Sequence, residues 1–191
     1  MIDGIKGKIA QSKMLKQRRR SLAAMLVALS VVVSAPTPAH GDGGVNIEGT
    51  FSVVYAYPSA VNYCGDGAGE NSVSIQAQGL GNIPGLGAMF LDVKKCLIDW
   101  TTYSGTFTMS AGNGHVLRGT YEGTQGPYNE NGFSPFGGVM KVTGGTGRFR
   151  NMTGRLTFEA VSGPDAVGAI ASTFNGTAFY RVRGTVSPGN R

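Results

Sequence analysis

Four residues near the middle of the chain have side chains suited to binding a small molecule. Asp99 and Trp100 follow Cys96 closely and Tyr103 comes soon after, so an acid lies beside two aromatic rings. Tyr121 is a further candidate. Aromatic side chains supply a large contact area, and tyrosine adds a polar tip, so this set could bind a ring-containing or lipidic ligand. The alternative is structural: Trp100 packs in the core and Asp99 caps a turn.

Histidine is too scarce for most catalytic or metal-binding chemistry. The chain has two histidines, and His40 adjoins the N-terminal leader described below, which leaves His115. One histidine cannot build a multi-histidine metal site, and no GxSxG motif accompanies it. His115 also follows Gly112-Asn113-Gly114, a setting typical of a turn. We therefore expect no metal, no cofactor and no catalytic triad.

Glu159 could act as a general acid or base if it faced a water-poor interior. It alternates with Phe158 and Ala160, however, and shares its face with Arg155. That pattern places Glu159 on the solvent side of a strand. The sequence thus leaves enzymatic activity open but assembles no catalytic residues in support of it.

The first 39 residues have the pattern of a secretory signal peptide. A basic segment ending in Arg18-Arg19-Arg20 precedes an apolar run from Leu22 to Val33, and small residues follow up to Ala39. The apolar run is shorter than the roughly 20 residues of a membrane span. We expect cleavage after Ala39, which leaves one domain of residues 40–191 in the periplasm or outside the cell, with no stable membrane span. An uncleaved membrane anchor is the alternative.

Removing the leader changes the charge of the protein. The whole chain has 17 Lys and Arg against 11 Asp and Glu, a formal net charge of +6. The leader contains seven of the basic residues and one acid, so ten of each sign remain. The mature chain lacks the basic surface that nucleic-acid binding requires, and we exclude a nucleic-acid partner.

Cys64 and Cys96 are the two cysteines of the chain. An exported protein meets an oxidising compartment, so a disulfide between them is the default expectation. A free nucleophilic cysteine would need a base nearby. A zinc site would need more ligands, normally with CxxC spacing, and the sequence has none.

Beyond residue 45 the chain alternates apolar and polar residues with a period of two, as half-buried antiparallel strands do. Eight such runs are separated by turn residues: 51–57, 72–77, 89–93, 106–111, 115–122, 139–142, 155–160 and 177–186. All but two of the 31 glycines lie beyond the leader, which predicts a strongly bent sheet. We predict an all-β fold, an eight-stranded antiparallel barrel, with a β-sandwich as second choice. The glycine-rich patch of residues 79–87 is expected to form a long loop.

The stretch KVTGGTGRFRNMTGRLTF, residues 141–158, raises the question of a phosphate-binding loop. It lacks GxxxxGK[ST], and Arg150 stands where GxGxxG would need its third glycine. An alternating strand follows instead of a helix. We interpret the stretch as a tight corner in which Phe149 plugs the barrel end, and the glycines that allow the corner are Gly144, Gly145, Gly147 and Gly154.

This corner resembles the late motif of dirigent proteins, in which a GGTG(R/K)F turn precedes a glycine-containing strand. Residues 144–150, followed by Thr153-Gly154, have that order. Residues 105–108 and 117–124, with Gly-Thr pairs at strand ends, are a weaker match. The arrangement is also similar to the wider allene oxide cyclase-like barrel group, which includes small exported bacterial proteins of unassigned role. The resemblance implies an eight-stranded barrel with a central cavity, often assembled as a trimer, and carries over no active-site residue.

Three functions are consistent with these patterns. The first, our leading hypothesis, is an exported non-catalytic barrel that binds a small apolar or aromatic molecule in its lumen. The second is an isomerase or cyclase acting on a lipidic substrate, which needs a buried carboxylate or tyrosine with a shifted pKa. The third is a structural or surface-interaction protein whose barrel is filled by its own side chains.

Overall fold

The computed structural model describes residues 44–66, 68–163, 166–167 and 174–189. The leader, residues 1–39, lies outside the described residues, so the signal peptide, its cleavage and the extent of the mature domain stay predictions. In the part that is described, no helix has the length and apolar character to cross a membrane.

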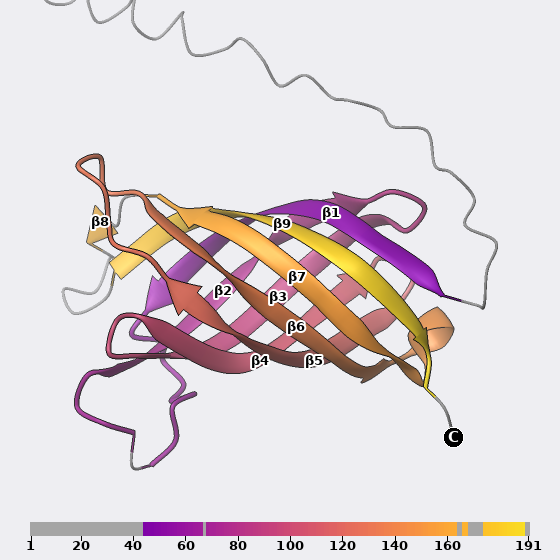
Figure 1. Cartoon of the computed structure of the whole chain (residues 1–191), viewed down its shortest axis with the longest axis horizontal. Coiled ribbons are helices and arrows are strands. Elements are labelled where there is room, and N and C mark those ends of the chain that lie inside the picture. The colour runs from indigo at the N-terminus through magenta and orange to yellow at the C-terminus, as the bar shows by residue number, and fades with distance from the viewer. Residues whose placement is uncertain (1–43, 67, 164–165, 168–173, 190–191) are drawn as a thin grey trace, which may run out of the picture. The chain divides into compact units, whose positions relative to one another are not determined.

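Nine strands are present in the described residues, and they form one antiparallel sheet (Figure 1). In chain order they are β1 (Val45–Tyr57), β2 (Ser72–Ile83), β3 (Gly87–Ile98), β4 (Thr102–Ala111), β5 (Val116–Gln125), β6 (Ser134–Gly145), β7 (Met152–Ser162), β8 (Ala166–Val167) and β9 (Phe174–Pro188). A turn of 3-10 helix, η1 (Gly147–Phe149), lies between β6 and β7.

The sheet closes on itself into a barrel. Each strand from β1 to β6 pairs with the next, and β7 pairs with β9. β1 then pairs with β9 along its whole length, from Val45 opposite Val186 to Tyr57 opposite Phe174. The short β8 pairs with the start of β9. Eight long strands therefore make the wall, so the predicted eight-stranded antiparallel barrel is confirmed and a sandwich is excluded.

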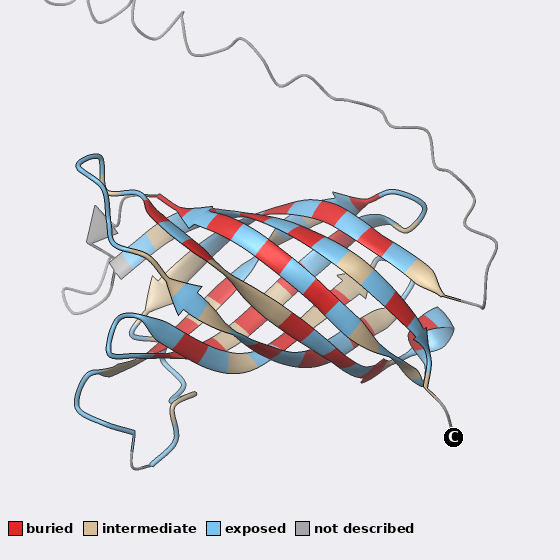
Figure 2. Ribbon diagram, viewed as in Figure 1, coloured by how far each residue is buried: buried red, intermediate tan, exposed pale blue. Residues whose placement is uncertain are grey.

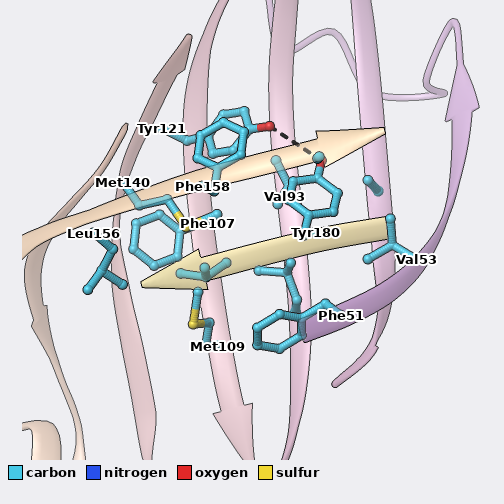
Figure 3. Packing of buried hydrophobic residues seen from close by; sticks show 14 of the residues in the cluster. Phe51, Val53, Val93, Phe107, Met109, Tyr121, Met140, Leu156, Phe158 and Tyr180 are labelled. Atoms are coloured by element: carbon cyan, nitrogen blue, oxygen red, sulfur yellow. Dashed lines mark hydrogen bonds between the residues drawn. The ribbon is translucent and has the colours of Figure 1, made fainter. Parts of the chain in front are cut away.

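Buried and exposed residues alternate along the strands, which turns one face of each strand into the interior (Figure 2). In β1, Phe51 and Val53 are buried while Ser52 and Val54 between and beyond them are exposed. Large side chains fill the middle of the barrel (Figure 3), as expected for a barrel of eight strands. Those at most 2% exposed include Phe51, Phe107, Met109, Tyr121, Met140, Leu156 and Phe158.

The connections alternate between the two ends of the barrel because neighbouring strands are antiparallel. One end carries the tight turns at residues 84–86 and 112–115 and the η1 corner. The other end carries the longer connections of residues 58–71 and 126–133 and the turn at 99–101. We call this second end the loop end.

The sequence predicted a long loop for residues 79–87, and this prediction is wrong. These residues continue β2, make a tight turn and begin β3. Gly79 faces the interior and pairs with Val53 of β1, and a Cβ at Gly79 would collide with the carbonyl oxygen of Ser52. The missing side chain therefore lets two strands approach closely inside the wall, which is the strand role of glycine that sequence reasoning overlooked.

The predicted disulfide between Cys64 and Cys96 is confirmed. Cys96 alternates with the inward residues of β3, so it faces outward, yet it is buried, with 6% exposure. The bridge fastens the connection of residues 58–71 to the outside of the wall. In the same connection, the backbone N–H of Tyr63 donates a hydrogen bond to the Ser74 hydroxyl at 2.8 Å.

Candidate ligand-binding pocket

A pocket opens at the loop end of the barrel. Its lining is mostly apolar with a few polar groups, which is the usual composition of small-molecule sites. The aromatic members are Tyr55, Tyr57, Trp100, Tyr128, Phe136 and Tyr180; the aliphatic members are Ile75, Ala77, Leu97 and Ala178; the polar members are Lys95, Gln125 and Ser162. The cavity measures about 30 Å³, enough for roughly two water molecules.

Lys95 is the only buried charged side chain among the residues that the structure describes, at 5% exposure. It lies in β3 on the same face as Val93 and Leu97, so strand alternation turns it into the barrel. Its Nζ lies 4.5 Å from the ring centroid of Tyr103 and 4.8 Å from that of Phe136. Cation–π contacts with a desolvated ammonium contribute about 2 kcal/mol.

The ammonium of Lys95 has no counter-charge within the described part of the chain, where the three ion pairs involve other residues. Desolvation by burial lowers the pKa of Lys95 from 10.5 to about 8. The side chain is therefore still mostly protonated at neutral pH. A positive charge thus lies in an aromatic environment, where the faces of the Tyr103 and Phe136 rings stabilise it.

Buried tyrosines close the pocket toward the middle of the barrel. Tyr103 donates a hydrogen bond to the carbonyl of Gly137 at 2.9 Å, and the hydroxyls of Tyr121 and Tyr180 lie 3.3 Å apart (Figure 3). Burial raises the pKa of Tyr180 to about 12 and raises the pKa values of Tyr103 and Tyr121 well above 10. These phenols stay neutral at ordinary pH and act as hydrogen-bonding groups.

Trp100 lies at the rim of the pocket. It is the single tryptophan of the chain and is 53% exposed, with its ring edge-on to Tyr57 at a centroid distance of 6.4 Å. Asp99 and Trp100 are the central residues of a turn, with φ of 49° and 59°, closed by a 3.1 Å hydrogen bond from Thr101 N–H to Ile98 C=O. Positive φ is rare for bulky residues and costs roughly 1–3 kcal/mol.

The structure brings three of the four predicted ligand-binding residues to this region. Trp100 lines the pocket. Tyr103 and Tyr121 do not line it, but their ring centroids lie 5.1 Å apart and the Tyr103 ring contacts Lys95 of the pocket. Asp99 is exposed in the turn and does not line the pocket. The alternative interpretation of Trp100 as a core residue is wrong, because the chain reverses at the barrel rim and leaves the indole half exposed.

The candidate acid–base residues lie away from the pocket. The carboxylate of Glu159 pairs with Arg183 at 2.9 Å on the outer wall, so the predicted solvent-side position of Glu159 is confirmed. His115 follows the turn at residues 112–114, at the opposite end of the barrel. In the described ranges, no three His, Cys, Asp or Glu side chains gather in a way that could hold a metal ion.

The glycine-rich motif forms the corner at the end opposite the pocket. Gly144-Gly145 ends β6, η1 follows, and Gly154 lies in β7. Phe149 is 1% exposed and belongs to the core cluster. The hydroxyl of Thr146 accepts a hydrogen bond from Val116 N–H at 3.1 Å, so the corner is fastened to the start of β5.

Gly147→Ala is expected to lower the free energy of unfolding by about 1–3 kcal/mol. Gly147 has a φ of 58°, and a Cβ there would collide with the imidazole of His115. Gly112→Ala is the matched control, because a Cβ at Gly112 meets nothing within 4 Å. The free energy of unfolding of Gly112→Ala should fall by less than about 0.5 kcal/mol. Equal losses for the two variants in urea unfolding would contradict a tight corner at Gly147.

Sequence reasoning missed Lys95, although a signal was present. In the alternation of Met89, Leu91 and Val93, position 95 falls on the inward face. Lysine is almost never fully buried without a partner, and this general tendency concealed the pattern.

No family model and no curated protein matches the sequence. A dirigent protein is among the solved structures that match. It is the pterocarpan synthase dirigent protein GePTS1, with 11% sequence identity, a TM-score of 0.39, and an alignment that covers 80% of this chain and 91% of that chain. Dirigent proteins are the family that the glycine-rich corner resembles. At this identity and TM-score the match says nothing about ligand or activity, and the barrel assignment rests on the strand pairing.

Proposed function

We propose that this protein is an exported, non-catalytic barrel that binds a small, largely apolar or aromatic molecule in the pocket at its loop end. The observation that carries the proposal is Trp100, the one tryptophan of the chain, which adopts positive φ at the rim of an aromatic-lined pocket. Residues in disfavoured backbone conformations cluster at ligand sites, where the strain serves binding.

Export is part of this proposal. The leader pattern of residues 1–39 supports it. The disulfide between Cys64 and Cys96 supports it as well, because such bonds persist in oxidising compartments. A homotrimer, which the family resemblance implies, is an expectation of the same kind.

A filled barrel that acts through its outer wall is the second candidate. The small cavity of about 30 Å³ favours it. So do apolar side chains exposed outside: Leu80 pairs in register with Phe90, and Val161 pairs with Phe179. Exposed apolar patches on soluble proteins often mark interaction sites.

The isomerase alternative gains no support from the pocket. Glu159, which could have served as its acid or base only in the interior, is on the outer wall. The buried phenols of Tyr103 and Tyr121 have pKa values raised by burial, which moves them away from the range in which a proton is exchanged readily at neutral pH.

Trp100→Gly is expected to weaken the binding of a neutral aromatic probe about tenfold without lowering stability. Glycine removes the indole, whose contact with an aromatic ligand contributes on the order of 1 kcal/mol or more. Glycine also adopts positive φ without strain, so the turn should form as readily as before. N-phenyl-1-naphthylamine becomes fluorescent in apolar surroundings, and its titration gives the affinity, while thermal unfolding gives the stability.

Phe90→Ser provides the control, because Phe90 is an exposed aromatic residue on the outer wall, at 38% exposure. It should leave the affinity for the probe unchanged. The opposite result would be a lower affinity for the probe in Phe90→Ser and an unchanged affinity in Trp100→Gly. It would place binding on the outer wall and favour the second candidate.

A further inference from the structure

A buried lysine with no counter-charge among the described residues lies in the pocket. Lys95 lines the cavity, is 5% exposed, and forms no ion pair with another described residue. Buried charges are normally paired, because the loss of hydration is otherwise large. The rings of Tyr103 and Phe136 offset part of that loss, but they carry no negative charge.

The other lining residues restrict the chemistry of a partner for Lys95. Ile75, Leu97 and Ala178 make neighbouring walls apolar, so a highly hydrated ligand would lose water without replacement there. A phosphate or sulfate group needs several donors around its oxygens. Lys95 is the one cation among the described residues that line the pocket, so the charge it can match is a single negative one.

We propose that the pocket selects small monocarboxylic acids, with the carboxylate paired to Lys95 and an aromatic or aliphatic body among the pocket rings. This inference rests on the proposed function and names its ligand class. The carboxylate supplies a counter-charge that none of the described residues provides. The apolar body covers the pair from water, where a charge–charge attraction is strongest.

Entry of such an acid requires the rim to move. The cavity of about 30 Å³ is smaller than a single aromatic ring. Trp100 is half exposed on the rim, so rotation of its side chain widens the opening without disturbing the packed middle of the barrel. The filled middle then limits the ligand to one ring or a short chain.

The test compares an acid with its neutral amide. Calorimetric titrations of 3-phenylpropanoate and 3-phenylpropanamide into the purified protein at about pH 6.5 should show the acid binding at least tenfold more tightly. Lys95→Met should remove that preference, so that acid and amide bind with similar affinity. Lys94→Met is the matched control and should keep the preference, because Lys94 faces outward beside Asp92, at 3.7 Å.

The pH dependence gives a second measurement. Among the described residues, the titratable groups in the pocket and in the rings packed beneath it are, apart from Lys95, all phenols: Tyr55, Tyr57, Tyr103, Tyr121, Tyr128 and Tyr180. Burial raises the pKa values of Tyr103, Tyr121 and Tyr180 above the ordinary value of about 10. The preference for the acid should therefore be constant near neutral pH and should fall above about pH 8, where free Lys95 loses its proton.

Each other outcome is decisive. Equal affinities for acid and amide in the wild type would overturn the inference and leave the proposed function standing, whereas no binding of either compound would reject both. A preference that persists in Lys95→Met would locate the anion elsewhere and overturn the inference. If Lys95→Met does not fold, the wild type decides, because a preference that stays constant up to about pH 9.5 would exclude Lys95 as its source.

Discussion

The double substitution Cys64→Ser, Cys96→Ser is expected to lower the free energy of unfolding by about 3–4 kcal/mol. The bridge joins positions 32 residues apart, and the loop it closes contains all of β2 and most of β3. Without it, the unfolded chain gains the freedom that loop closure removes. Urea unfolding should show the loss, and the melting temperature should fall by about 10 °C.

Asn62→Ala is the control for local loosening. The side-chain oxygen of Asn62 accepts hydrogen bonds from Cys64 N–H at 3.0 Å and from the Ser74 hydroxyl at 3.2 Å, so this variant weakens the same connection and keeps the covalent bridge. Its loss should be about 1 kcal/mol. If the double serine variant loses no more than Asn62→Ala, the bridge only anchors the connection of residues 58–71, and the estimate for the whole barrel is wrong.

The strands could be predicted because each has one face in the core. The period of two at Phe51 and Val53, or at Phe158 and Ala160, is a direct consequence of that half-burial. The pairing of β1 with β9 has no local signal, since it joins the two ends of the described chain. It depends on the twist and bending of the whole sheet, to which close approaches such as that at Gly79 contribute.

The pocket could be predicted only where its residues are neighbours in sequence. Trp100 and Tyr103 form a visible cluster. Tyr180 reaches the same region from the far end of the chain, through the pairing of β9 with β7 and β1. The height of a residue along the barrel axis depends on register, and composition does not contain it. Lys95 was missed for a different reason, because its chemistry favours water and only its position in β3 places it inside.

Lys95→Met is expected to raise the free energy of unfolding by about 1–2 kcal/mol at pH 7. Burial lowers the pKa of Lys95 from 10.5 to about 8, so the folded protein binds this proton less tightly than the unfolded chain. Each pKa unit of this difference corresponds to about 1.4 kcal/mol. The cation–π contribution of about 2 kcal/mol, which is lost with the ammonium, is subtracted from the total. Methionine keeps a flexible apolar side chain of similar length and removes the charge.

The pH dependence of the stability difference between Lys95→Met and the wild type shows whether the gain comes from removing a desolvated charge or from better packing. Between about pH 8 and 10.5 the unfolded wild-type chain binds more protons than the folded protein, so wild-type stability relative to the variant rises with pH in this window. The advantage of Lys95→Met should thus be full below pH 8 and nearly gone above 10.5. Phenols shared by both proteins cancel in the difference, and Lys94→Met should show no such trend. An advantage that is constant across the window would mean that Lys95 is not desolvated. An advantage that disappears above about pH 10.5, as expected, would mean that the wild-type barrel tolerates a destabilising charge at a position where a ligand could neutralise it. Such a cost in stability is expected of a residue that serves binding.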